Sequence, residues 1–220
     1  MLWQGLELTV AVGLCAMLIA IGLGLLGAWA KLSQPGIIKG LANTYTSLIR
    51  GVPELLLILL VYYGAPTLIQ DLSSNLGYAF IVDLNPFVAG FLTIGFIYGA
   101  FATEVFRGAY LAVPRGQIES AHAIGMSSST AFRRIILPQM WRFALPGLGN
   151  VWMVLIKATA LISVIQLDEL MRNASIAAGA TRQPFTFFLT ASFMYLGITI
   201  ISITIQRKAE VWANRGIRSV

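Results

Sequence analysis

The sequence predicts an all-α protein that crosses a membrane about five times. Of its 220 residues, 57% are hydrophobic and only 11% are charged, and the mean hydropathy is +0.79. Soluble globular domains carry about 25% charged residues, so this composition excludes an ordinary soluble domain. The apolar residues also gather in long runs that short polar loops separate, which is the pattern of a multi-pass membrane protein.

Five apolar runs are long enough for a helix to cross about 30 Å of hydrocarbon. The predicted spans are residues 7–30, 42–70, 86–112, 143–167 and 184–206. The first run has no basic start and no small-residue cleavage site followed by a soluble domain. We therefore interpret it as a retained span rather than a removed signal peptide.

The second predicted span is interrupted by the sequence Arg50-Gly-Val-Pro53-Glu54. Proline removes a backbone hydrogen-bond donor and glycine loosens a helix, so a break or kink is expected there. Two structural alternatives stay open: an ordinary proline kink, or the point where the chain enters the span from the cytosol.

Basic residues follow the odd-numbered spans and are sparse elsewhere. Twelve of the fifteen Lys and Arg lie on one predicted side, in the loops after spans one and three and at the C-terminus: Lys31, Lys39, Arg50, Arg107, Arg115, Arg133, Arg134, Arg142, Arg207, Lys208, Arg215 and Arg218. By the positive-inside rule this side is cytoplasmic and the N-terminus lies outside. The excess positive charge thus indicates orientation and not binding to nucleic acid.

Several apparent motifs carry no chemistry in this context. Gly22-Leu-Gly24-Leu-Leu-Gly27 lies inside an apolar run without a preceding strand, so we assign these glycines, like Gly95 and Gly99, to close helix packing and not to a nucleotide site. His122 is the only histidine and Cys15 the only cysteine, so neither a metal site nor a disulfide is expected. The sequence also lacks a P-loop, so we expect no ATP site in this chain.

Three ionisable residues fall inside or at the ends of predicted spans, where a charge is costly: Glu54, Glu104 and Lys157. Glu104 is expected either to pair locally with Arg107 or to support a translocation cavity with Tyr98 and Thr103. For Lys157 the alternatives are a buried ion pair that fixes helix packing and a role in the cavity or its gate.

The polar loop after the third span contains Glu119-Ser-Ala-His-Ala-Ile-Gly125, followed by Ile135-Ile-Leu137-Pro138. The small residues allow a short helix to lie close against a partner surface, Gly125 supplies a positive φ that ends the helix, and Ser127 to Ser129 offer caps for the next one. This loop, at about residues 115–140, resembles the coupling loop of permease subunits of bacterial ABC importers. The chain departs from the family pattern only at Ser120, where alanine is usual.

Further matches extend the resemblance over nearly the whole chain, which is similar to permease subunits of the polar amino-acid uptake family, of the histidine and lysine-arginine-ornithine type. The matching segments are Arg50 to Pro53, with Val52 in place of threonine, Tyr98 to Gly108, Val113 to Gln117, Ala144 to Pro146 and Lys157 to Thr159. The resemblance implies a type I ABC importer permease: residues 1–220 as a single transmembrane permease domain in the bacterial inner membrane.

The resemblance also implies partners and a mechanism. Two permeases, identical or homologous, would sit on a cytoplasmic ATPase dimer that holds ATP and magnesium, while an extracytoplasmic binding protein delivers the amino acid; no cofactor is expected in the chain itself. Closure of the ATPases would tilt the spans through the coupling helix. The residues expected to couple to the ATPase are Glu119, Ser120, Ala121, Gly125, Leu137 and Pro138, with Ala121 and Ala123 filling a groove on it.

A substrate pathway is expected along the spans, with these residues as candidates: Glu54, Tyr98, Thr103, Glu104, Asn150 and Lys157. A carboxylate at Glu54 favours a cationic amino acid such as arginine, lysine, ornithine or protonated histidine, because an unpaired buried carboxylate has no other compensation. Glutamine or another polar amino acid remains an alternative substrate. The alternative class of protein is an ATP-independent secondary transporter or channel that uses the intramembrane charges for ion coupling.

Overall fold

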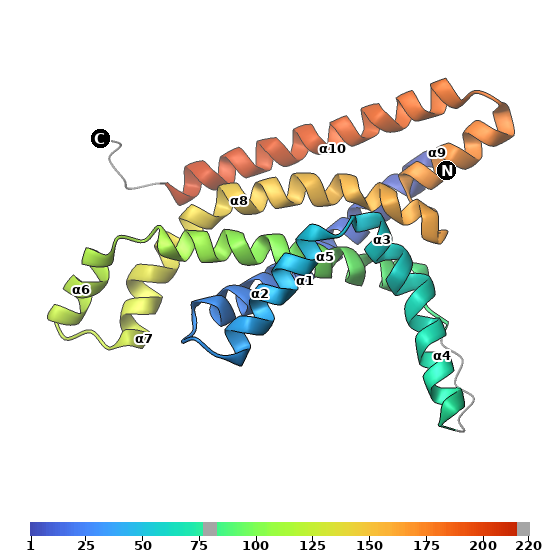
Figure 1. Ribbon diagram of the computed structural model, residues 1–220. Helices are drawn as coiled ribbons and strands as arrows, with labels where there is room; N and C mark the ends of the chain where they lie inside the picture. Colours follow the sequence, from blue (N-terminus) through green and yellow to red (C-terminus); the bar gives the residue numbers. More distant parts are fainter. Residues whose placement is uncertain (77–82, 215–220) are drawn as a thin grey trace.

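The computed structural model describes residues 1–76 and 83–214, and all regular structure in these two segments is helical (Figure 1). The α-helices are α1 (Leu2–Leu32), α2 (Ile37–Gly51), α3 (Glu54–Leu59), α4 (Ala65–Asn75), α5 (Pro86–Leu111), α6 (Arg115–Ala123), α7 (Ser128–Ala131), α8 (Leu137–Ala158), α9 (Leu170–Thr181) and α10 (Pro184–Ala213). Two π-helical turns, η1 (Leu60–Gly64) and η2 (Phe132–Ile136), connect neighbouring helices without a loop, and a 3-10 helix, η3 (Thr159–Ile165), continues α8.

The predicted number of spans is confirmed within the described segments. Five helical stretches there are long and apolar enough to cross a membrane: Leu2–Leu32, Glu54–Asn75, Pro86–Leu111, Ser128–Ile165 and Pro184–Ala213. The boundaries differ most for the second span. Residues 42–51, predicted to open it, belong instead to the separate helix α2.

The break between α2 and α3 lies where the sequence predicts it. Val52 and Pro53 are extended, with φ/ψ of −104°/138° and −56°/132°, and α3 begins at Glu54. Proline has no N–H to continue the ladder of α2, and it disfavours helical geometry at the residue before it. The two helices therefore meet at a bend formed by two residues.

The core is formed by α1, α5 and α8, and the α1–α5 contact is the most extensive in the molecule. Glycines permit this close approach: a Cβ on Gly24 would lie 2.6 Å from the Cβ of Ala102, and a Cβ on Gly95 would lie 2.6 Å from that of Ile19. The packing role predicted for these glycines is confirmed except at Gly22, where an added Cβ would have no packing neighbour within 4 Å.

Helix α9 was not predicted, because its twelve residues are mostly small and form no long apolar run. Its N-cap, Glu169, is fully buried and accepts hydrogen bonds of 2.8 Å from the backbone N–H of Met171 and of Arg172. The hydroxyls of Thr9 on α1 and Tyr195 on α10 also point at this carboxylate, at 3.4 and 3.3 Å. Burial raises the pKa of Glu169 despite these donors.

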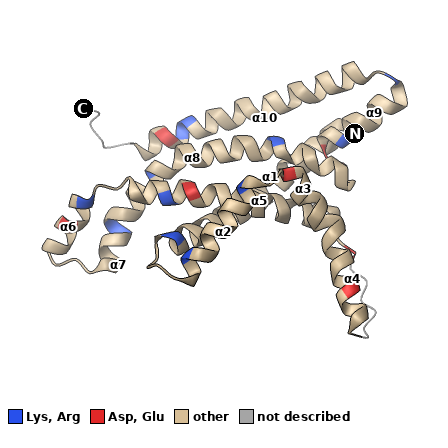
Figure 2. Ribbon diagram, in the orientation of Figure 1, with Lys and Arg blue, Asp and Glu red and all other residues tan. Residues whose placement is uncertain are grey.

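The two ends of the helix bundle differ in charge. The helices α6 and α7 lie at the end where α10 terminates, whereas the N-terminus and α9 lie at the opposite end (Figure 1). In Figure 2 most of the ribbon positions coloured blue for Lys and Arg lie toward the α6–α7 end. Arg215 and Arg218, which were counted on the same side, lie outside the described residues.

Candidate functional site

The polar loop folds into a helical hairpin that projects from the bundle. Helix α6 follows the extended residue Pro114, and α7 follows Ser127, whose Oγ accepts a hydrogen bond of 3.3 Å from the N–H of Thr130. The predicted serine cap for the second helix is thus present.

Gly125 ends α6 with a positive φ of 82°, as the sequence predicts. The N–H of Gly125 donates to the carbonyl of His122, and the N–H of Met126 donates to that of Ala121, both at 3.0 Å. These two bonds form a Schellman motif, which requires a left-handed residue at the position of Gly125. His122 is exposed, and its Nδ1 lies 3.2 Å from the carbonyl oxygen of Met126.

The outward face of α6 differs from the predicted one. Glu119, Ser120 and Ala123 are exposed, whereas Ala121 is only 2% exposed because it packs within the hairpin. Ala121 therefore cannot fill a groove on a partner, which corrects that expectation. The apolar residue available at the tip is Ile124, which is 74% exposed and was not singled out from the sequence.

Two contacts tie the hairpin to the spans. Nε2 of Gln139 on α8 donates to Oε1 of Gln117 on α6 at 2.5 Å. Leu137 packs against the core cluster that contains Ala28 and Phe106, while Pro138 opens the first turn of α8 and is exposed. Leu137 thus packs against the spans at the base of the hairpin.

At the α2–α3 break, the structure brings together two of the predicted pathway residues. The hydroxyl of Tyr98 on α5 donates a hydrogen bond of 3.0 Å to Oε1 of Glu54. The Tyr98 ring stacks on Phe101 with a centroid distance of 5.5 Å, and the guanidinium carbon of Arg50 lies 5.2 Å from the Phe101 centroid. We call Arg50, Glu54, Tyr98 and Phe101 the break cluster.

Arg50 lies in the last turn of α2, four residues before the second span begins at Glu54. Its contact with Phe101 sets it beside the middle of α5, which runs from Pro86 to Leu111. The cation–π contact with the Phe101 ring partly stabilises the charge of Arg50. A positive and a negative side chain, Arg50 and Glu54, therefore flank the break.

Glu104 pairs locally with Arg107, one of the two predicted alternatives, and also with a partner on another helix. Its Oε2 lies 2.9 Å from Nη2 of Arg107, and its Oε1 lies 2.5 Å from Nζ of Lys31 on α1. Lys31 had been assigned only to the orientation signal, because a contact between residues 73 positions apart leaves no local pattern.

Thr103 is fully buried between α1 and α5, where it packs against Gly27 and donates a hydrogen bond of 2.8 Å to the carbonyl of Gly99. This burial gives Thr103 a packing position, so it does not face a cavity, which was the second alternative for Glu104 with Tyr98 and Thr103.

Asn150 and Lys157, which are seven residues apart, lie on one exposed face of α8. The buried ion pair considered for Lys157 is absent: this lysine is exposed and forms no ion pair with any residue that the structure describes.

Comparisons with known proteins extend over most of the chain. Residues 20–210 match the model of the family described as binding-protein-dependent transport system inner membrane component. The nopaline transport system permease protein of Agrobacterium fabrum is 48% identical, over 98% of this chain and 92% of the relative. The histidine/lysine/arginine/ornithine transport system permease protein of Salmonella typhimurium is 43% identical, over 96% and 94%.

A solved structure described as an amino acid ABC transporter with histidines superimposes with a TM-score of 0.82 at 30% identity, covering 95% of this chain and 92% of the other. The MetNI methionine ABC transporter shares the fold, with a TM-score of 0.69 at 16% identity over 97% and 94% of the two chains.

Proposed function

The chain belongs to the family of binding-protein-dependent transport system inner membrane components, and from this premise we propose that it is the permease subunit of an ATP-driven importer of cationic amino acids. Relatives described as transporting nopaline, and histidine, lysine, arginine and ornithine, support this substrate class.

The observation that carries the proposal is the hairpin of α6 and α7. Its outward residues Glu119, Ser120 and Ile124 are exposed, while Gln117 and Leu137 connect it to the spans. Helix α5 leads from the hairpin to the break cluster, and Tyr98 lies about 20 Å from Leu111 along it. A displacement of α6 would therefore move α5, and with it the residues that we assign to substrate binding.

The break cluster offers complementary charges for an amino acid. Glu54 is half-buried, receives a hydrogen bond from Tyr98 and has no ion pair within the described chain, so its negative charge is available to a cationic side chain. Arg50 supplies a positive charge suited to a carboxylate, because its planar guanidinium can donate two parallel hydrogen bonds. We assign these two residues to opposite ends of the substrate.

Three kinds of partner follow from this function. A cytoplasmic ATPase dimer, which holds ATP and magnesium, contacts the hairpin; a binding protein delivers the amino acid at the end that carries α9; and a second permease, identical or homologous, completes the pathway. The exposed face of α8 with Asn150 and Lys157 supports the last assignment, since a charge facing lipid is costly. We assign the protein to the bacterial inner membrane, with the hairpin and the C-terminus in the cytoplasm and the N-terminus outside, as the positive-inside rule suggests.

The test is reconstitution of the complex that co-purifies with the chain. Proteoliposomes that contain ATP and magnesium, with the associated binding protein outside, should accumulate radiolabelled arginine or lysine, and omission of ATP should abolish uptake. Uptake without ATP, driven by a proton or sodium gradient, would contradict the proposal and identify a secondary transporter.

A further inference from the structure

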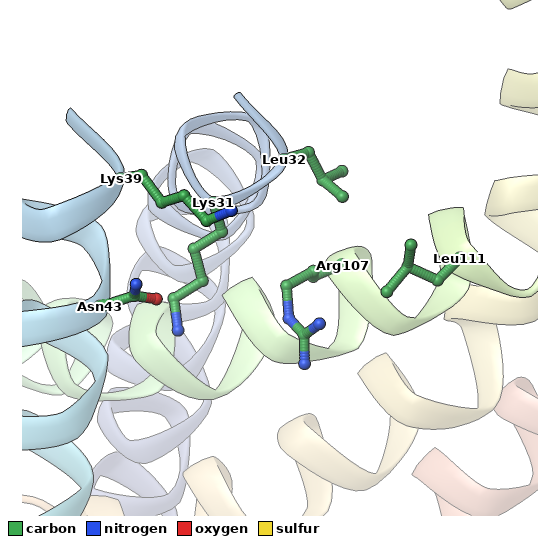
Figure 3. Close-up of a pocket in the computed structure, with 6 residues that line it drawn as sticks. All are labelled: Lys31, Leu32, Lys39, Asn43, Arg107 and Leu111. Carbon is green, nitrogen blue, oxygen red and sulfur yellow. The ribbon is translucent and has the colours of Figure 1, made fainter. Parts of the chain in front are cut away.

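A basic cavity lies at the end of the bundle that carries the hairpin, away from the break cluster. It encloses about 380 Å³ between α1, α2 and α5, and it is lined by Lys31, Leu32, Lys39, Asn43, Arg107 and Leu111. Figure 3 shows the polar side chains from these three helices arranged around the same space. The family function described above assigns no role to this cavity.

The charges of the cavity do not balance. Lys31 and Arg107 share the single carboxylate of Glu104, and Lys39 forms no ion pair in the part of the chain that the structure describes. Three cations therefore face one anion. Lys31, whose side chain is only 10% exposed, takes up one oxygen of Glu104 and Arg107 takes up the other, so Lys39 is left without a carboxylate. An anion bound in the cavity would complete the neutralisation.

The position of the cavity indicates the source of that anion. It lies at the C-terminal ends of α1 and α5, both of which are long enough to span a membrane, so it opens at the membrane boundary. Leu32 and Leu111 line the same cavity and are 37% and 57% exposed. An inorganic anion gains nothing from these leucines, whereas the glycerol and first acyl carbons of a lipid would cover them.

We propose that this cavity binds the phosphodiester headgroup of an anionic phospholipid. Lys31, Lys39 and Arg107 contact the phosphate, Asn43 donates to it or to the glycerol hydroxyls, and the leucines contact the acyl chains. A bound headgroup would join α2 to α1 and α5. Because α5 continues into α6 through Val113 and Pro114, the lipid would brace the base of the hairpin.

The test is native mass spectrometry of the full-length chain, with the subunits that accompany it, in a nonionic detergent to which phosphatidylglycerol is added. The variant is Lys39→Gln, because Lys39 can lose its charge without leaving Glu104 unpaired. The matched control is Lys208→Gln, at an exposed lysine near the end of α10 and outside the cavity. We expect Lys39→Gln to weaken phosphatidylglycerol binding by about fivefold, the effect of one cation near an anionic surface, and Lys208→Gln to leave it unchanged.

Several outcomes would overturn the proposal. Equal binding by both variants and the unmodified chain would place the lipid elsewhere. Equal retention of phosphatidylcholine would show that negative charge is not recognised. Displacement by inorganic phosphate, but not by chloride at the same ionic strength, would identify a soluble-anion site instead. Loss of an accompanying subunit from Lys39→Gln, with lipid binding intact, would assign the cavity to a protein contact.

Discussion

The hydroxyl of Tyr98 donates a hydrogen bond of 3.0 Å to a carboxylate oxygen of Glu54, across 44 positions of sequence. Tyr98 lies on α5 and is only 2% exposed, whereas Glu54 is the first residue of α3, directly after the break between α2 and α3. Helix α5 thus orients, through Tyr98, the carboxylate of Glu54 at the start of α3. This contact also connects the helix that leads to the hairpin with the residue we assign to the substrate cation.

Replacement of Glu54 by glutamine should discriminate between substrates. The variant keeps the shape of the side chain and removes its charge, and a hydrogen bond to a charged group is worth about 1.5–3 kcal/mol. Uptake of arginine or lysine at low concentration should fall by about tenfold or more, while uptake of glutamine should change far less. Equal losses for charged and neutral substrates would indicate a structural carboxylate, and no loss would place Glu54 outside the pathway.

Tyr98→Phe should act through Glu54. The ring remains to stack on Phe101, but the carboxylate loses its donor. We expect arginine uptake to fall less than in Glu54→Gln, and the double variant to transport no worse than Glu54→Gln alone. A double-mutant cycle on initial uptake rates measures this coupling, which is about 0.5–3 kcal/mol for residues in contact. Strictly additive effects would show that the two residues act independently.

Gly125→Asp should uncouple the hairpin from its partner while the chain still inserts in the membrane. A Cβ on Gly125 would have no atom within 4 Å, so the added side chain faces outward. A charge that is left without a partner at a desolvated interface costs several kcal/mol, so uptake should fall by about tenfold or more.

Gly125→Asn is the matched control, because asparagine has the same shape, carries no charge and tolerates a positive φ. ATPase co-purification and uptake should be measured in parallel for both variants. Normal uptake by Gly125→Asp with a normal yield of complex would remove this loop from the mechanism.

Glu104→Gln should destabilise the protein because it leaves Lys31, with a 10% exposed side chain, beside Arg107 without a carboxylate. We expect a loss of about 1–3 kcal/mol, reduced from the value for a fully buried pair because Glu104 is partly exposed. Asp168→Asn, which breaks the exposed pair with Arg172, should cost less than about 1 kcal/mol. Thermal unfolding of the purified proteins compares the two, and a Lys31→Gln/Glu104→Gln double variant should recover part of the loss.

Thiol labelling should reveal on which side of the membrane the hairpin and α4 lie. In a Cys15→Ser background, a cysteine at Ser128 on the hairpin should react with a membrane-impermeant reagent only after cells are opened. A cysteine at Ser74 on α4 should react once the outer barrier alone is permeabilised. Both serines are exposed in the folded chain, so burial does not protect either position. The reverse order of labelling would place the hairpin outside and exclude a cytosolic ATPase contact.

Local patterns predicted the parts of the molecule that local chemistry determines. The length of the apolar runs predicted the number of spans, and Pro53 predicted the break between α2 and α3. Gly125 predicted the end of α6, and Ser127 predicted the start of α7. In each of these cases the cause lies within a few residues of the effect.

Long-range packing determined the features that were missed. The cation–π contact of Arg50 with Phe101 was not predicted, because it depends on the approach of α2 to α5. The sequence showed the positive charge of Lys31 but not its pairing with Glu104. The burial of Ala121 depends on how α6 packs against η2. Only the relative placement of helices reveals such contacts.

The buried carboxylate of Glu169 has a consequence for biosynthesis. Its hydrogen-bond donors come from the first span through Thr9, from the last through Tyr195, and from the start of α9. A chain that emerges from the ribosome in order has inserted Thr9 long before Tyr195 is made, so this junction can close only after nearly the whole polypeptide has been synthesised. Until then the N-terminal end of α1 has no permanent contact with α10, and a chain truncated before residue 195 would present an incomplete junction to membrane proteases.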